Sequence, residues 1–221
     1  MSLEIPRVPD TQVDLTELER DALAELANIG VSRAAANLRK MVGKQVLLSV
    51  PSVEVLNQKT AAALVGEREG DKLVAVRQTF SGSFSGRALL IFPQAKSLEL
   101  IRAITGDAET EDVEDEALAE TGNVILNGCL ATMANILRQT LTISLPEVVR
   151  GSGARLFELK DPPDSSGLVL FLYINFSILD LDVRGYIALL MDLPSLSNLK
   201  VLLGEFIASV MNENDNEIDA H

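Results

Sequence analysis

The stretch DALAELAN, residues 21–28, occurs a second time in this chain as EALAETGN, residues 116–123. The two copies start 95 residues apart, and the register between them continues without a gap until Pro51 falls on Pro146. An acid, a glutamate, an asparagine and a proline therefore recur at identical spacing. Repetition at a fixed period indicates that one structural unit has been duplicated.

The similarity returns after the prolines, with small changes of offset that loops would absorb. SGRALLIFP at 85–93 resembles VRGYIALLM at 183–191, and SLELIRAITG at 97–106 resembles SLSNLKVLLG at 195–204. The glycine that ends each member of the last pair is suited to closing a helix. We predict a single domain over residues 1–221, made of two repeats at 14–106 and 112–204, an acidic linker at 106–116 and an acidic C-terminal tail at 205–221.

Each repeat has the pattern of a long helix, then strands, then a second helix. Thr16 and Glu19 predict a capping box before the first helix, which runs to about Val42 and is closed by Gly43. Runs of β-branched and apolar residues follow in both repeats, and their short connections favour antiparallel pairing. The predicted fold class is α+β: a tandem pseudo-twofold repeat with an antiparallel β-sheet and two long helices packed on it.

The two repeated helices each have one polar stripe. At about 100° per residue, the polar side chains of each helix fall within roughly 60° of one another. They are Asp21, Glu25, Asn28 and Ser32 in the first helix, and Glu116, Glu120, Asn123 and Asn127 in the second. The opposite faces are predicted to be core, and they contain Leu23, Ala27, Gly30, Ala34 and Met41 in the first helix and Leu118, Gly122, Ile125, Cys129 and Ile136 in the second.

The side-chain inventory excludes several kinds of chemistry. A formal net charge of −13 argues against a nucleic-acid binder. His221 is the only histidine and Cys129 the only cysteine, so neither a Ser-His-Asp triad nor a zinc site can be assembled. The segment SGSFSGR at 81–87 lacks the Gly-Lys-Ser/Thr end of a P-loop, and we interpret it as strand and hairpin.

The sequence also predicts a cellular compartment. No run reaches the roughly 18 uninterrupted apolar residues that a membrane span requires. The N-terminus, MSLEIPRVPD, lacks the basic start and apolar core of a signal peptide. A single cysteine excludes an internal disulfide framework and is typical of a reducing environment. We therefore expect a cytoplasmic protein that binds neither membranes nor nucleic acid.

A polar stripe on one helix alone is most simply its solvent-facing side. Two copies favour another interpretation. A solvated face has no reason to keep an acid, a glutamate and an asparagine at spacings of four and three, or to use asparagine in place of better helix formers. Most residues after the asparagine differ between the copies, whereas the glutamate, the asparagine and the acidic first position are kept. The stripes therefore predict a functional site on each helix.

The pattern resembles the signature of the CheC, CheX and FliY group of chemotaxis phosphatases. That signature has Asp or Ser, then Glu after three residues, Asn after two more and Pro after another twenty-two. The chain meets it twice, with Asp21, Glu25, Asn28 and Pro51 and with Glu116, Glu120, Asn123 and Pro146. Glu116 departs from the usual Asp or Ser. Two motifs in one chain resemble CheC most, because CheX has a single motif and the chain after residue 204 is too short for the extra C-terminal domain of FliY.

The resemblance implies hydrolysis of the aspartyl phosphate on the response regulator CheY. The implied catalytic residues are Glu25, Asn28, Glu120 and Asn123. Each asparagine would position the attacking water, as a glutamine does in small GTPases, and each glutamate would pair with the active-site lysine of the regulator. The implied binding residues, which extend the contact surface or shape the adjacent strand, are Asp21, Glu116, Pro51 and Pro146. The protein would need no cofactor of its own, because the Mg²⁺ is expected on the partner regulator.

Two other interpretations of the stripes stay open from the sequence. The chain could be a non-catalytic docking module for a response regulator or for the flagellar switch, with the same fold. A divalent-cation site is the weaker alternative, because Glu and Asn at these spacings offer only an incomplete shell of oxygens. The resemblance also suggests the receptor deamidase CheD as a binding partner.

Overall fold

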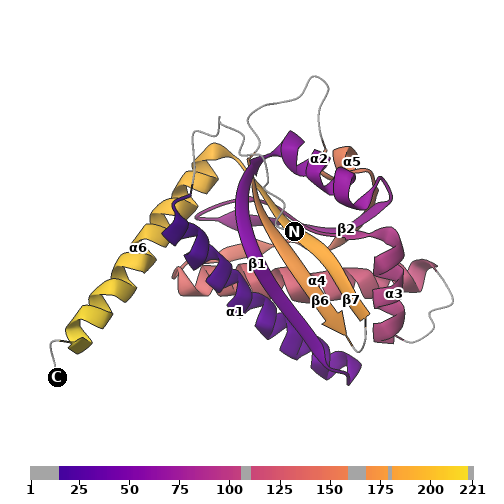
Figure 1. Cartoon of the computed structure of the whole chain (residues 1–221), viewed down its shortest axis with the longest axis horizontal. Coiled ribbons are helices and arrows are strands. Elements are labelled where there is room, and N and C mark those ends of the chain that lie inside the picture. The colour runs from indigo at the N-terminus through magenta and orange to yellow at the C-terminus, as the bar shows by residue number, and fades with distance from the viewer. Residues whose placement is uncertain (1–14, 106–110, 159–167, 179–180, 219–221) are drawn as a thin grey trace.

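The computed structural model describes residues 15–105, 111–158, 168–178 and 181–218 (Figure 1). Its elements are, in chain order, α1 (Glu17–Val42), β1 (Val46–Asn57), α2 (Gln58–Glu69), β2 (Leu73–Gly82), β3 (Gly86–Pro93), α3 (Gln94–Thr105), α4 (Glu111–Ile136), β4 (Leu141–Ile143), β5 (Glu147–Gly151), α5 (Gly153–Leu156), β6 (Leu168–Ile178), β7 (Leu181–Met191) and α6 (Leu193–Ile218). The order of elements in the first half recurs in the second, where the short strands β4 and β5 stand in place of β1. The pseudo-twofold symmetry itself stays a prediction.

The strands form one antiparallel sheet, as the short connections predicted. Its order is β1-β6-β7-β3-β2-β4, and β5 also pairs with β2. The long helices α1 and α4 pack together on one face of the sheet, and α2 and α5 pack on the other (Figure 1). The predicted α+β class, an antiparallel sheet covered by two long motif-bearing helices, is therefore confirmed.

Helix α1 begins and ends where the sequence predicted. The Thr16 backbone N–H donates to the Glu19 carboxylate at 2.7 Å, and the Glu19 backbone N–H donates to the Thr16 hydroxyl at 3.2 Å. Gly43 ends the helix with φ at 65°, a left-handed conformation that suits glycine. These local signals fix the position of the first polar stripe along the chain.

The acidic segment expected to be a linker is in part helical. Helix α4 begins at Glu111, so the second half of the predicted linker at 106–116 is wrong, and residues 106–110 lie outside the described residues. Acidic side chains in the first turn interact favourably with the positive end of the helix dipole, so an acidic run is also typical of a helix start. One carboxylate there, that of Asp115, pairs with Arg150 of β5.

The predicted C-terminal tail is also helical over most of its length. Helix α6 continues through Gly204 to Ile218, and residues 219–221 lie outside the described residues. A glycine inside a helix costs only about 1 kcal/mol, and Phe206 and Ile207 beyond it are partly buried against the core. The second half of α6 projects away from the sheet (Figure 1).

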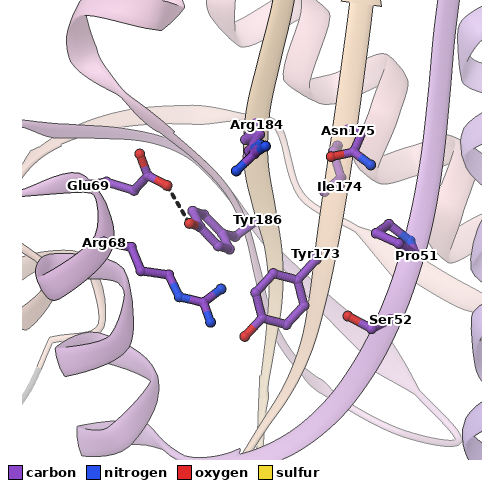
Figure 2. Close-up of a pocket in the computed structure, with 10 residues that line it drawn as sticks. Pro51, Ser52, Arg68, Glu69, Tyr173, Ile174, Asn175, Arg184 and Tyr186 are labelled. Atoms are coloured by element: carbon purple, nitrogen blue, oxygen red, sulfur yellow. Dashed lines mark hydrogen bonds between the residues drawn. The ribbon is translucent and has the colours of Figure 1, made fainter. Parts of the chain in front are cut away.

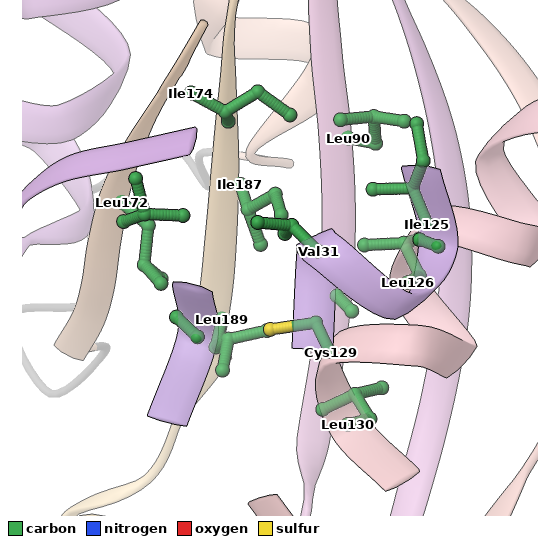
Figure 3. Packing of buried hydrophobic residues seen from close by; sticks show 14 of the residues in the cluster. Val31, Leu90, Ile125, Leu126, Cys129, Leu130, Leu172, Ile174, Ile187 and Leu189 are labelled. Carbon is green, nitrogen blue, oxygen red and sulfur yellow. The ribbon is translucent and has the colours of Figure 1, made fainter. Parts of the chain in front are cut away.

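The main core lies between the helix pair α1–α4 and the sheet. Val31 of α1 and Ile125, Leu126 and Cys129 of α4 lie against inward side chains of β3, β6 and β7 (Figure 3). Cys129 is fully buried, and burial raises the pKa of its thiol to about 12, so it is a packing residue. Met41 was predicted to be core, but it is 53% exposed because the last turn of α1 extends beyond the cluster.

The two helices approach most closely where each has a glycine. A Cβ on Gly30 would lie 2.7 Å from the Cα of Cys129 and 2.8 Å from the carbonyl oxygen of Gly128. A Cβ on Gly128 would lie 3.0 Å from the carbonyl oxygen of Gly30. This contact between main chains fixes how the two polar stripes lie relative to each other.

Among the described residues, no helix is both long enough and apolar enough to cross a membrane.

Candidate functional site

The structure places the acidic residues and asparagines of the two predicted sets on α1 and α4, with one proline in β1 and the other between β4 and β5. We call Asp21, Glu25, Asn28 and Pro51 the first centre, and Glu116, Glu120, Asn123 and Pro146 the second centre. All four acidic residues are exposed, and both asparagines are half-buried. Each asparagine lies one turn after its glutamate on the same helix face. No hydrogen bond among the described residues joins one centre to the other, so they are two separate sites.

The carboxylates of the two centres are unpaired within the described part of the chain. Among the described residues, none of the four acidic side chains in the two centres forms a hydrogen bond or an ion pair. By contrast, Glu19 and Asp115 on the same helices pair with a lysine and an arginine. The exposed carboxylates of Glu25 and Glu120 are therefore available to a cation on a partner.

In the first centre, the main chain of β1 holds the Asn28 carboxamide at two points. The Val50 N–H donates to Asn28 Oδ1 at 2.7 Å, and Asn28 Nδ2 donates to the Val50 carbonyl oxygen at 3.0 Å. Because Val50 supplies one donor and one acceptor, these bonds also determine which end of the amide is the oxygen. The asparagine therefore has a defined position and orientation.

A bulge in β1 explains why Val50 is available to Asn28. The pairing of β1 with β6 shifts between Ser49 and Ser52, and Val50 and Pro51 have no partner in the ladder. Proline lacks an N–H and cannot continue a ladder, so a bulge is expected there. Val50 is buried, and a buried peptide group needs a hydrogen-bond partner. Asn28 supplies that partner, which explains why a proline stands beside the motif.

In the second centre, side chains rather than main chain hold the asparagine. Asn123 Oδ1 accepts from Gln78 Nε2 at 3.0 Å and from Asn127 Nδ2 at 2.7 Å. Gln78 Nε2 also donates to the Ser144 carbonyl oxygen at 2.8 Å. That carbonyl can only accept, so Gln78 must present its NH₂ group and Asn123 must present its oxygen. The network thus determines the orientation of Asn123.

The strand beside the second centre differs from that beside the first. Pro146 lies between the separate strands β4 and β5, where β1 is continuous. Leu145, which occupies the place of Val50 in the repeat, is 88% exposed and forms no bond with Asn123. The two centres share residue types but differ in how each asparagine is anchored.

The hydrogen-bond inventories leave different groups free on the two asparagines. A carboxamide has two N–H donors and two lone pairs on its oxygen. Asn28 uses one of each, so it keeps one donor and one acceptor position. Asn123 uses both lone pairs and keeps both N–H donors. Only Asn28 can therefore accept and donate at once without breaking an existing bond.

Sequence reasoning did not identify Gln78 or Val50 as parts of these sites. Gln78 is only 1% exposed and lies on the strand face that otherwise contains Val74, Val76 and Phe80. A polar residue at an inward position of a strand must find a partner, so the alternation of β2 contained this signal. The bonds of Asn28 to Val50 could not be predicted in this way, because they use main-chain groups that every residue type has.

Comparison with known proteins supports a relationship over most of this chain. The model of the CheX chemotaxis phosphatase family matches residues 74–169, and that of the CheC-like family matches residues 18–55. A Halobacterium salinarum protein named putative CheY-P phosphatase CheC1 is 27% identical over 148 residues, which are 65% of this chain and 73% of that protein. The Bacillus subtilis flagellar motor switch phosphatase FliY is 25% identical over 153 residues, which are 66% of this chain but only 39% of FliY.

Solved structures show the same fold. Thermotoga maritima FliY superposes with a TM-score of 0.68 at 19% identity, over 87% of this chain and 98% of that one. The middle domain of FliM from H. pylori gives a TM-score of 0.60 at 10% identity, over 85% of this chain and 99% of that one. At these sequence identities, the two similarities show a shared fold and nothing further.

Proposed function

We propose that this chain, which the models of the CheX and CheC-like families match over residues 74–169 and 18–55, hydrolyses the aspartyl phosphate of a CheY-like response regulator. The observation that best supports this proposal is the anchored Asn28, which keeps one donor and one acceptor beside the unpaired carboxylate of Glu25. The curated relatives with the name CheY-P phosphatase support the same substrate class.

The chemistry proposed for each asparagine is the positioning of water. An acyl phosphate is already activated, so the protein needs no nucleophile of its own. A carboxamide can accept a hydrogen bond from the attacking water and donate one to a phosphoryl oxygen, which aligns the water for in-line attack. The half-buried position suits this role, because the amide is held firmly while one edge can be reached by a partner. Alignment of this kind contributes several kcal/mol to lowering a barrier.

The acidic residues would hold the regulator in place. Glu25 and Glu120 are proposed to pair with a cationic side chain at the regulator's active site, and Asp21 and Glu116, one turn earlier, to extend that contact. Pro51 and Pro146 would shape the strand segments beside them. The proposal assigns the Mg²⁺ that phosphoryl chemistry requires to the regulator, and none to this chain.

The proposal is tested by following the decay of a phosphorylated CheY-like receiver domain with and without this chain. We expect the aspartyl phosphate to decay at least ten-fold faster when the chain is present, as an order-of-magnitude figure for water positioning. A phosphate lifetime that stays the same, together with binding detected by titration, would instead support a docking module.

The docking alternative has one observation in its favour. The chain has the fold of the FliM middle domain, and a fold alone does not determine activity. On that alternative, the exposed acidic stripes would bind a partner without reaction. A docking role would leave the free donor and acceptor of Asn28 unexplained, so we prefer the phosphatase proposal.

A substitution of Asn127 tests whether its hydrogen bond to Asn123 lowers the activity of the second centre. Asn127 occupies the place of Ser32 in the repeat, and Ser32 forms no bond with Asn28. Asn127→Ser is expected to free one lone pair of Asn123 and to raise the activity of this centre by about two- to ten-fold, the worth of one hydrogen bond. The measurement is receiver dephosphorylation in an Asn28→Ala background, where the second centre acts alone. A lower rate than in that background would show that Asn127 supports Asn123 instead.

A further inference from the structure

A hollow of about 490 Å³ lies on the face of the sheet opposite the two centres (Figure 2). Its floor consists of Tyr173 and Asn175 on β6 and Arg184 and Tyr186 on β7, and Arg68 at the end of α2 forms one side. The volume lies within the usual range of small-molecule sites, about 300–1,000 Å³. Pro51 of the first centre also lines the hollow, whereas the acidic residues and asparagines of the two centres do not.

The lining is rich in hydrogen-bond donors and includes two arginines, Arg68 and Arg184. Arg184 is exposed and forms no hydrogen bond or ion pair with the described residues. The guanidinium carbon of Arg68 lies 5.1 Å from the centre of the Tyr173 ring, a cation–π arrangement, and burial raises the pKa of the nearby Glu54 carboxyl while the Arg68 charge lowers it. In a chain with a net charge of −13, two such arginines at one hollow are unusual.

The two tyrosines supply a floor and a free hydroxyl. Their ring centroids are 5.7 Å apart, and Phe171 packs against both. The Tyr186 hydroxyl donates a hydrogen bond to the carboxylate of Glu69, which also lines the hollow. The Tyr173 hydroxyl is buried and has no partner among the described residues. Burial and the nearby Glu54 raise the pKa of Tyr173, with Arg68 partly opposing them, so the hydroxyl stays a neutral donor.

We propose that this hollow binds a small molecule with a phosphate or carboxylate group, which takes hydrogen bonds from Arg68, Arg184 and the Tyr173 hydroxyl. An oxyanion matches this set because arginine forks and hydroxyl donors both suit its oxygens. The aromatic floor suits an apolar or planar body attached to the anion. The inference concerns binding and does not depend on the proposed phosphatase activity.

The site is tested by NMR titration of the full-length, ¹⁵N-labelled protein with sodium phosphate and, separately, with sodium acetate, each against sodium chloride at equal ionic strength. We expect saturable shifts of the amides of Ser52, Asn175 and Gly185, with a dissociation constant of about 1 mM for the bare anion. The stronger of the two titrations identifies which oxyanion the site prefers.

Variants separate specific binding from general attraction. Arg184→Gln is expected to weaken binding about ten-fold, the worth of one charge-assisted hydrogen bond, without an effect on folding because its side chain is exposed and unpaired. Arg39→Gln on α1 removes an exposed arginine away from the hollow and should leave the titration unchanged. Shifts that do not saturate, or equal losses in the two variants, would overturn the proposal.

Discussion

Asn28→Ala is expected to remove most of the acceleration of receiver dephosphorylation, by about 100-fold, the typical loss of one preorganised hydrogen-bond donor. Asn123→Ala is expected to reduce this acceleration by a smaller factor. The reason is that Asn28 is anchored by Val50 with one donor and one acceptor still free, whereas both lone pairs of Asn123 are occupied. The double variant should leave only the intrinsic decay of the regulator. Stopped-flow or radiolabel decay assays with each variant measure these rates.

Two controls distinguish lost chemistry from lost structure. Asn28→Ala also leaves buried Val50 peptide groups without partners, which costs about 1–3 kcal/mol of folding free energy. Thermal melting therefore has to show that the variant is folded at the assay temperature. Ser32→Ala removes an exposed polar group from the same stripe and should change neither melting nor rate. If the double variant retained full acceleration, the water-positioning proposal would be wrong and the docking module would replace it.

Gly30→Ala is expected to lower the free energy of unfolding by about 2 kcal/mol, the usual range for overpacking. The added methyl group would meet main-chain atoms of Cys129 and Gly128 on α4, which cannot move away as a side chain can. The helices would have to separate. The melting temperature should fall by about 4–8 °C for a chain of this size, as measured by circular dichroism.

The matched control is the same substitution at Gly204. That glycine lies inside α6, and an added Cβ has no heavy atom within 4 Å. Gly204→Ala should therefore raise stability by up to about 1 kcal/mol through helix propensity alone. Opposite signs for one chemical change would show that the contact at Gly30, and not glycine itself, determines the result. Destabilisation of similar size at both positions would contradict this explanation.

The sequence predicted well where the signals were local and repeated. The capping box of Thr16 and Glu19, the end at Gly43 and the buried position of Cys129 depend on short-range chemistry, and the structure confirms each of them. The antiparallel sheet followed from short connections. The extents of α4 and α6 were misjudged because acidic residues favour both a linker and the start of a helix, and because the cost of one glycine is too small by itself to end a helix.

The details of the two centres could not be predicted, because they depend on contacts between distant segments. The stripes gave the residue types, but the partner of Asn28 is main chain 22 residues away, and a main-chain group is the same for every residue type. The restraint on Asn123 comes from Gln78, 45 residues earlier in the chain. The hollow likewise needs α2, β1, β6 and β7 to meet, and no motif in the sequence indicates that meeting.

The strand order has a consequence for the origin of this chain. Strand β1 of the first half pairs with β6 of the second, and β4 and β5 of the second half pair with β2 of the first. Strand β1 therefore has its ladder partner in the other half of the chain, and so do β4 and β5. If the chain arose by duplication, the single-copy ancestor would have needed a second molecule of itself to fold. In that case, joining two copies in one chain would have made the association independent of protein concentration, and each centre could then have changed without altering the other.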